Sequence, residues 1–111
     1  MTDFERRQHL RAFVSIAVEV RDERGFSFHS TRDVSASGCF FDRAIPHAVG
    51  ARVALSFSLP GDPRTIRCQG EVVNVPDTKE YGMGIRFLDL APADAQRIDA
   101  FARQVLEGGR A

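Results

Sequence analysis

The chain has 111 residues, the usual size of one domain, and 43% of them are apolar, too many for a disordered segment. Its 15 basic and 15 acidic residues cancel, and a zero net charge argues against a protein that holds a nucleic-acid polymer through bulk electrostatics. The N-terminal sequence lacks the apolar core of a secretion signal and no apolar run is long enough to span a membrane, so we expect a soluble, cytoplasmic protein without membrane insertion.

After a polar, charge-dense N-terminal segment, apolar and polar residues alternate in five stretches, and one further stretch, residues 38–41, is a short apolar run. Alternation of this kind predicts half-buried β-strands. The stretches cover residues 14–20, 26–33, 38–41, 53–59, 66–75 and 81–87. At Val72-Val73 the apolar residues change from even-numbered to odd-numbered positions. This change predicts a bulge or burial of both faces of that strand.

The period of the pattern changes once, near the C-terminus. Pro92 suits the first turn of a helix, apolar residues then recur every three to four positions, and Gly108-Gly109 ends the pattern. We therefore expect a helix over about 92–107 whose apolar stripe covers the strands. Six short strands with frequent turns and one closing helix predict a small, mainly β protein, either a barrel or a sandwich.

The sequence carries no recognisable catalytic or metal-binding motif. Cys39 and Cys68 lie 29 residues apart in apolar contexts, and we expect them to be buried thiols. The three histidines are scattered without the spacing of metal ligands. Phosphate-loop, nucleophile-elbow and zinc-protease patterns are missing as well, so we expect neither an enzyme nor a metal or cofactor.

The first candidate site is the pair Arg7 and Arg11, which forms the pattern RxxxR just before the first strand. Together with Arg6 they give residues 6–11 three arginines and no acidic residue. Forked guanidinium groups fit phosphates and also the O6 and N7 atoms of guanine. A solvated, charged chain end would carry the same residues without any ligand.

The second candidate site is the pattern DxSxxG, formed by Asp33, Ser35 and Gly38 between two strands. A carboxylate offers two acceptor oxygens that fit the N1–H and N2–H₂ donors of guanine, and Ser35 offers a hydroxyl. Gly38 permits a close approach of the backbone. An ordinary serine or aspartate turn closed by glycine would have the same composition.

Together and in this order, the two motifs resemble those of the PilZ domain family, small bacterial β-barrels that bind the messenger cyclic di-GMP. The spacing of 22 residues from Arg11 to Asp33 fits that family. The segments DVSASGCFF, GARVALSFSLP and YGMGIRF are similar to strands of the family, so the resemblance covers nearly the whole chain. It implies a six-stranded antiparallel PilZ-type β-barrel with a C-terminal helix.

The resemblance also implies a role for each motif residue, and the charge-rich composition of residues 1–11 predicts a division of the chain. A flexible N-terminal arm, residues 1–11, would carry RxxxR, and residues 12–111 would form the barrel domain with its helix. Arg7 and Arg11 would contact the phosphates and guanine bases of cyclic di-GMP. Asp33 would pair with a guanine edge, Ser35 would bond a phosphate, and Gly38 would let the backbone approach the ligand.

An arginine directly before RxxxR, here Arg6, accompanies binding of an intercalated ligand dimer in this family, which favours two ligands per chain. We expect the ligand to draw the three arginines of residues 1–11 onto the barrel. The ordered arm would then form a surface for an unidentified partner protein, in motility, pili, exopolysaccharide synthesis or transcription.

Other functions stay open. A PilZ-like protein–protein interaction adaptor that does not depend on the nucleotide would use the arginines against an acidic partner surface. A small oligonucleotide-binding barrel would need a basic groove with exposed aromatic residues. Neutral charge disfavours that function, as does the placement of most phenylalanines on the core faces of strands, with Phe4 as the exception. The oligomeric state is open too, because barrel edges could pair into a homodimer.

Overall fold

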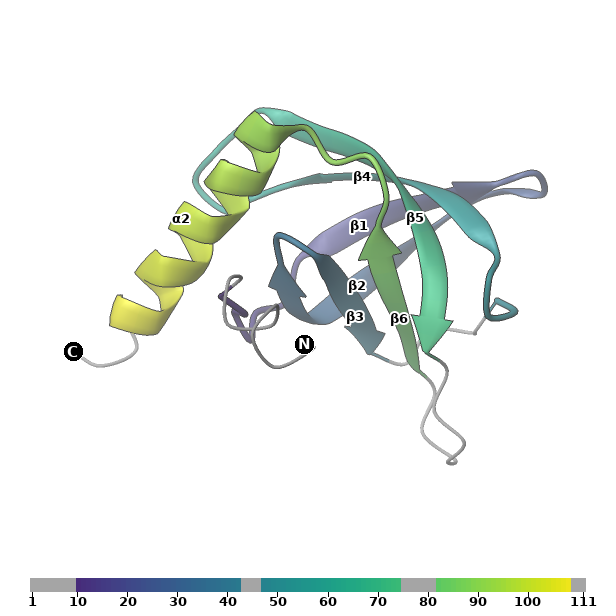
Figure 1. Cartoon of the computed structure of the whole chain (residues 1–111), viewed down its shortest axis with the longest axis horizontal. Helices are drawn as coiled ribbons and strands as arrows, with labels where there is room; N and C mark the ends of the chain where they lie inside the picture. Colours follow the sequence, from purple (N-terminus) through teal and green to yellow (C-terminus); the bar gives the residue numbers. More distant parts are fainter. Residues whose placement is uncertain (1–9, 43–46, 75–81, 109–111) are drawn as a thin grey trace.

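The six predicted strands close into one antiparallel barrel, and a helix follows them (Figure 1). This computed structural model describes residues 10–42, 47–74 and 82–108. Its elements are β1 (Ala17–Asp22), β2 (Gly25–Ser35), β3 (Gly38–Asp42), β4 (Arg52–Ser58), β5 (Thr65–Asn74), β6 (Gly82–Phe87) and α2 (Pro92–Gly108). The prediction of a mainly β barrel with a C-terminal helix is therefore confirmed.

Neighbouring strands pair in the order β1, β2, β3, β6, β5, β4, and β4 pairs with β1 to close the sheet. Closure satisfies the main-chain groups that an edge strand would leave unpaired. Each of the six described strands has a neighbouring strand on both sides, although Gly25–Ser30 of β2 pair with β1 alone. The oligomeric state itself stays open.

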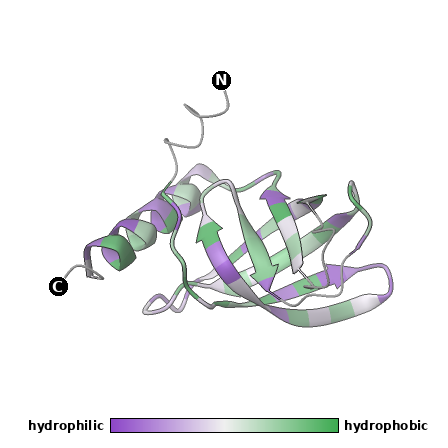
Figure 2. Cartoon of the chain, turned by 90° about the horizontal axis from the view of Figure 1, so that it is seen from below, coloured by the Kyte–Doolittle hydropathy of each residue, from purple (hydrophilic) through white to green (hydrophobic). Residues whose placement is uncertain are grey.

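Strand alternation separates a buried barrel interior from an outer face. In β4, Val53, Leu55 and Phe57 are at most 5% exposed, and the residues between them face outward. Figure 2 shows hydrophobic and hydrophilic residues alternating along the strands. The predicted buried thiols, Cys39 and Cys68, are confirmed as free and buried, and burial raises the pKa of each, that of Cys68 to about 12.

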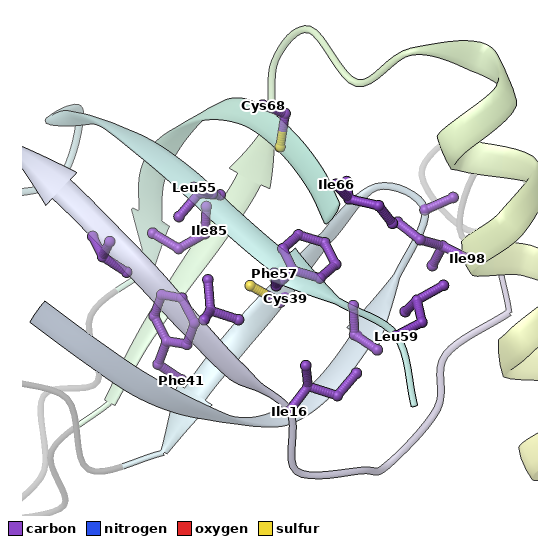
Figure 3. Packing of buried hydrophobic residues seen from close by; sticks show 14 of the residues in the cluster. Ile16, Cys39, Phe41, Leu55, Phe57, Leu59, Ile66, Cys68, Ile85 and Ile98 are labelled. Carbon is purple, nitrogen blue, oxygen red and sulfur yellow. The ribbon is translucent and has the colours of Figure 1, made fainter. Parts of the chain in front are cut away.

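Helix α2 lies across one end of the barrel (Figure 1). Its residues Ile98 and Ala102 are fully buried, and Figure 3 shows Ile98 close to Ile66 at that end of the core. Pro92 stands in the first turn, where its missing N–H has no helical partner to lose. The described ranges contain no helix with the length and apolarity needed to cross a bilayer.

One arginine fixes α2 to the turn between β4 and β5. The Nε and Nη2 atoms of Arg97 donate to Oδ2 of Asp62 at 3.0 and 2.7 Å, and its Nη1 donates to Oδ1 of Asp94 at 2.6 Å. The guanidinium and main-chain N–H of Arg64 and the guanidinium of Arg97 hold the pKa of Asp62 far below its usual value. The attachment of the helix therefore depends on an ionised Asp62.

Regular pairing of β1 begins at Ala17, three residues later than the alternation from Val14 predicted. The Oγ1 atom of Thr31, in β2, accepts a hydrogen bond from the N–H of Ile16 at 2.9 Å and donates one to the carbonyl of Val14 at 2.6 Å. A side-chain hydroxyl thus replaces a main-chain partner and interrupts the ladder.

Two strands contain irregularities. The register of β5 shifts between Val72 and Asn74, which confirms the bulge predicted at Val72-Val73. The register of β2 also shifts, between Thr31 and Asp33, and the sequence pattern did not predict this. The second shift determines where the DxSxxG motif faces.

Three phenylalanines besides Phe4 depart from the expected placement on core faces, and Phe4 itself lies outside the described residues. Phe13, Phe26 and Phe28 are 71%, 59% and 65% exposed. Phe26 and Phe28 occupy the outer face of β2, while His29 points inward against Phe41 with ring centroids 5.4 Å apart. Alternation gives the period of a strand but not which of its faces is buried.

We expect Asp62→Asn to lower the free energy of unfolding at pH 7, because a neutral amide pairs less strongly with Arg97. The pKa of Asp62 is lower in the folded chain than its unfolded value of about 3.9, so this stabilisation is complete above that pH and is lost as the pH falls toward the folded pKa. Urea unfolding at several pH values measures it. The difference between wild type and variant should be smaller at pH 3 than at pH 7, and a constant difference would contradict the assignment.

Candidate functional site

The bulge in β2 places the second motif on the outer face of the barrel. Before the bulge, Thr31 faces inward and pairs with the core residue Phe41. After the bulge, Val34 is the residue that faces inward. Arg32 is the extra residue between them. Because one inserted residue reverses the alternation, Asp33 turns to the outer face.

The carboxylate of Asp33 is buried beneath two arginines. Nη1 of Arg11 lies 3.7 Å from Oδ1, and Nε of Arg32 lies 3.3 Å from Oδ2. The side chain of Asp33 is 4% exposed, whereas those of Arg11 and Arg32 are 53% and 54% exposed. A buried carboxylate needs such partners, and about half of each arginine side chain remains open to solvent.

Main-chain pairing brings the first motif to the second. The N–H of Ala12 donates to the carbonyl of Val34 at 2.9 Å, and the N–H of Val34 donates to the carbonyl of Ala12 at 3.0 Å. This bridge holds Arg11 beside the buried carboxylate. Arg6 and Arg7 lie outside the described residues, so their placement stays a prediction.

Ser35 is buried and supports the turn between β2 and β3. Its Oγ lies 2.8 Å from Oγ of Ser37 and accepts a hydrogen bond from the N–H of Ser37 at 3.2 Å. The phosphate contact expected of Ser35 stays a prediction. Ser37, at the same turn, offers a second hydroxyl and lines a hollow on the outer face of the barrel.

Gly38 meets a steric demand from the barrel itself. It lies opposite Arg86 of β6, and a Cβ at this position would collide with the main-chain carbonyl oxygen of Ile85. A glycine is therefore needed for β3 and β6 to pair at this point. The approach of its backbone to a ligand stays a prediction.

These residues surround a hollow of about 300 Å³ on the outer face of β2, β3 and β6. The lining residues are Arg11, Asp33, Ser37, Gly38, Cys39, Phe40, Val73, Gly84, Ile85 and Arg86. The guanidinium of Arg32 lies over the ring of Phe40, 4.2 Å from its centroid, at the edge of this group.

Sequence analysis did not assign Phe40, Val73 or Arg86 to the site. The side chain of Arg86, although 60% exposed, also lines the hollow. Its place in the site follows from its position opposite Gly38. That position can be predicted only when the pairing of β3 with β6, which are distant in the sequence, is known.

Two larger hollows lie elsewhere on the surface. One of about 580 Å³ is lined by residues of β1, β4 and β5, and one of about 820 Å³ lies near the β1–β2 turn and contains His29 and His47. Neither contains a residue of the two motifs. Of the three hollows, the one of about 300 Å³ combines a buried carboxylate with exposed guanidinium groups, and we take it as the candidate site. In the described ranges, no group of three His, Cys, Asp or Glu residues could hold a metal ion.

The sequence matches the model of the PilZ domain family over residues 5–104. The chain therefore belongs to the PilZ family, whose members typically bind cyclic di-GMP and are generally not catalytic. This confirms the resemblance carried by the two motifs. A search of curated proteins found no match.

The fold is similar to solved structures of bacterial PilZ proteins. MotI/DgrA of Bacillus subtilis, an inhibitor of motility, superposes with a TM-score of 0.82 at 19% identity over 94% of this chain, which spans 53% of that protein. The PilZ domain of Escherichia coli YcgR with c-di-GMP gives 0.70 at 13% identity, covering 92% and 91% of the two chains. The PilZ domain of CeSA from a cellulose-synthesizing bacterium gives 0.57 at 14%, covering 91% and 98%.

We expect Gly38→Ala to destabilise the barrel by about 1–3 kcal/mol, because the added methyl group forces β3 and β6 apart. Gly108→Ala is the matched control, since nothing lies within 4 Å of a methyl group there. Urea unfolding compares the two variants with wild type. Equal stability of Gly38→Ala and Gly108→Ala would contradict the packing role of Gly38.

Proposed function

We propose that this protein is a cytoplasmic receptor for cyclic di-GMP that binds the dinucleotide through Arg7, Arg11, Asp33, Ser35 and Gly38. The observation that carries the proposal is the buried carboxylate of Asp33, which is paired with Arg11 beside the hollow. Residues of two motifs that are distant in sequence thus lie together. Membership of the PilZ family supports the same ligand, as does the likeness to the YcgR domain solved with c-di-GMP.

When the ligand binds, contacts with the ligand replace the ion pair between Arg11 and Asp33, and no buried group is left without a partner. In the complex, Asp33 accepts the N1–H and N2–H₂ donors of a guanine edge. Arg11 turns from Asp33 to a phosphate or to the O6 and N7 atoms of guanine. Arg32 stays beside Asp33 as its counter-charge.

The remaining arginines of the first motif belong to the proposed N-terminal arm, residues 1–11, which precedes a barrel domain of residues 12–111. The ligand's phosphates attract Arg7 to the barrel, and Arg6 accommodates a second, intercalated ligand molecule. The ordered arm and the exposed face of the ligand then form the surface that a partner protein reads.

One observation favours a second function, a protein–protein adaptor that does not depend on the nucleotide. Phe26 and Phe28 form an exposed, T-shaped pair with ring centroids 5.9 Å apart, and the guanidinium of Arg21 lies over Phe26. Exposed aromatic residues are frequent anchors of protein interfaces. In this function Arg11 would meet an acidic partner, and loss of the nucleotide would leave binding unchanged.

We expect Arg7→Ala, Arg11→Ala and Asp33→Ala each to weaken binding of cyclic di-GMP at least about tenfold, because a charge-assisted contact contributes roughly 1.5–3 kcal/mol. Isothermal titration calorimetry measures the affinity, with a linear dinucleotide as the ligand control. Arg103→Ala, an exposed arginine on α2, is the variant control and should bind like wild type.

The same titration gives the number of ligands. Wild type should bind two molecules per chain and Arg6→Ala fewer, if an intercalated pair is the bound form. Binding that all three substitutions leave unchanged would contradict the site, and a wild type that does not bind would favour the adaptor.

Saturating cyclic di-GMP should slow amide hydrogen exchange in residues 1–11, because the arm becomes fixed to the barrel. Exchange is followed by mass spectrometry of peptides from this segment, with peptides of α2 as the internal control. Unchanged exchange in the arm of a protein that binds the ligand would exclude the ordering mechanism while leaving the binding site in place.

A further inference from the structure

Arg86 lies between the hollow and an acidic residue on the outer face of the barrel. Strands β3, β6 and β5 run side by side, and Gly38, Arg86 and Glu71 lie opposite one another across them. Nη2 of Arg86 forms an ion pair with Oε1 of Glu71. The side chain of Arg86 is 60% exposed and also lines the hollow. Its guanidinium is thus held at the rim by a carboxylate.

Arg86 and Arg11 face the hollow from opposite sides. Arg11 belongs to the segment that pairs with one edge of β2, and β3 pairs with the other edge of β2 and also with β6. Three strand spacings, about 14 Å in total, therefore separate the main chains that carry the two arginines. A cyclic dinucleotide holds its two phosphates on opposite sides of one compact ring, so each arginine can meet a different part of the ligand.

We propose that Arg86 is a second ligand-binding arginine of this site, and that Glu71 restrains it by competing with the ligand for its guanidinium. The inference rests on the proposed function, since it concerns the same hollow and the same anionic ligand. Glu71 does not line the hollow, so it acts through Arg86. An ion pair this exposed is weak, and a phosphate in the hollow can displace the carboxylate.

The restraint sets the affinity of the site. Each ligand molecule that recruits Arg86 must first separate it from Glu71, so the ion pair lowers the apparent affinity without contacting the ligand. Removing the carboxylate frees the guanidinium and strengthens binding. Removing the guanidinium weakens binding, and Glu71 then no longer affects the affinity for the ligand.

Arg52 provides a matched control. It lies opposite Glu71 on the other side, in β4, and is exposed like Arg86, but it lines the hollow of about 820 Å³ instead. Its substitution removes an arginine from the neighbourhood of Glu71 and leaves the candidate site untouched.

Calorimetric titration with cyclic di-GMP tests the proposal on wild type, Arg86→Ala, Glu71→Gln, the double variant and Arg52→Ala. We expect Arg86→Ala to bind at least about tenfold more weakly and Glu71→Gln about threefold more tightly. The double variant should equal Arg86→Ala within about twofold, and Arg52→Ala should equal wild type. Circular dichroism and thermal unfolding confirm that each variant is folded.

Each outcome decides between the alternatives. Wild-type binding that neither Arg86→Ala nor Glu71→Gln changes would overturn this inference and leave the proposed receptor intact. A Glu71→Gln gain that persists in the Arg86→Ala background would show direct repulsion of the ligand by Glu71, which also overturns the restraint. A wild type that does not bind cyclic di-GMP overturns the proposed function and this inference with it.

Discussion

The extra residue in β2 determines what the outer face of the barrel carries. Without the bulge at Arg32, strand alternation would keep Asp33 in line with Thr31 and direct its carboxylate into an apolar core, where an unpaired charge is very costly. With it, the carboxylate faces outward and is covered by two guanidinium groups. The bulge thus reconciles a hydrophobic interior with a charged site on the same strand, and the hollow between β2 and β6 follows from that placement.

The frame and the site differ in how firmly their parts are held. The strands form a closed barrel, and α2, anchored by the Arg97–Asp62 pair, contacts β2 itself. The carboxylate of Asp33 therefore belongs to a stiff framework. Arg11 and Arg86 instead end in half-exposed guanidinium groups held by ion pairs that solvent can reach. A fixed acceptor flanked by adjustable cations suits a ligand that carries both hydrogen-bond donors and negative charge.

Local features of the sequence predicted the strands, the closing helix and the two motifs, because alternation, helical spacing and motif residues can all be read from neighbouring positions. The bulge in β5 was visible as a change of apolar parity at Val72-Val73. The bulge in β2 was not visible, because Thr31, Arg32 and Asp33 are all polar and show no alternation of apolar and polar residues that a bulge could interrupt. Arg86 and Glu71 were missed for another reason: they adjoin the site only through pairing between strands distant in the sequence.

The bridge between Ala12 and Val34 sets the register in which the two motifs meet. Its bonds join the residue after Arg11 to the residue after Asp33, and this register places the two charges side by side. A shift of the bridge by one residue would turn the arginine to the opposite side of its segment, since successive side chains in extended chain point in opposite directions. A relative with such a shift could keep every motif residue and an intact barrel and still lose the pairing that unites the motifs.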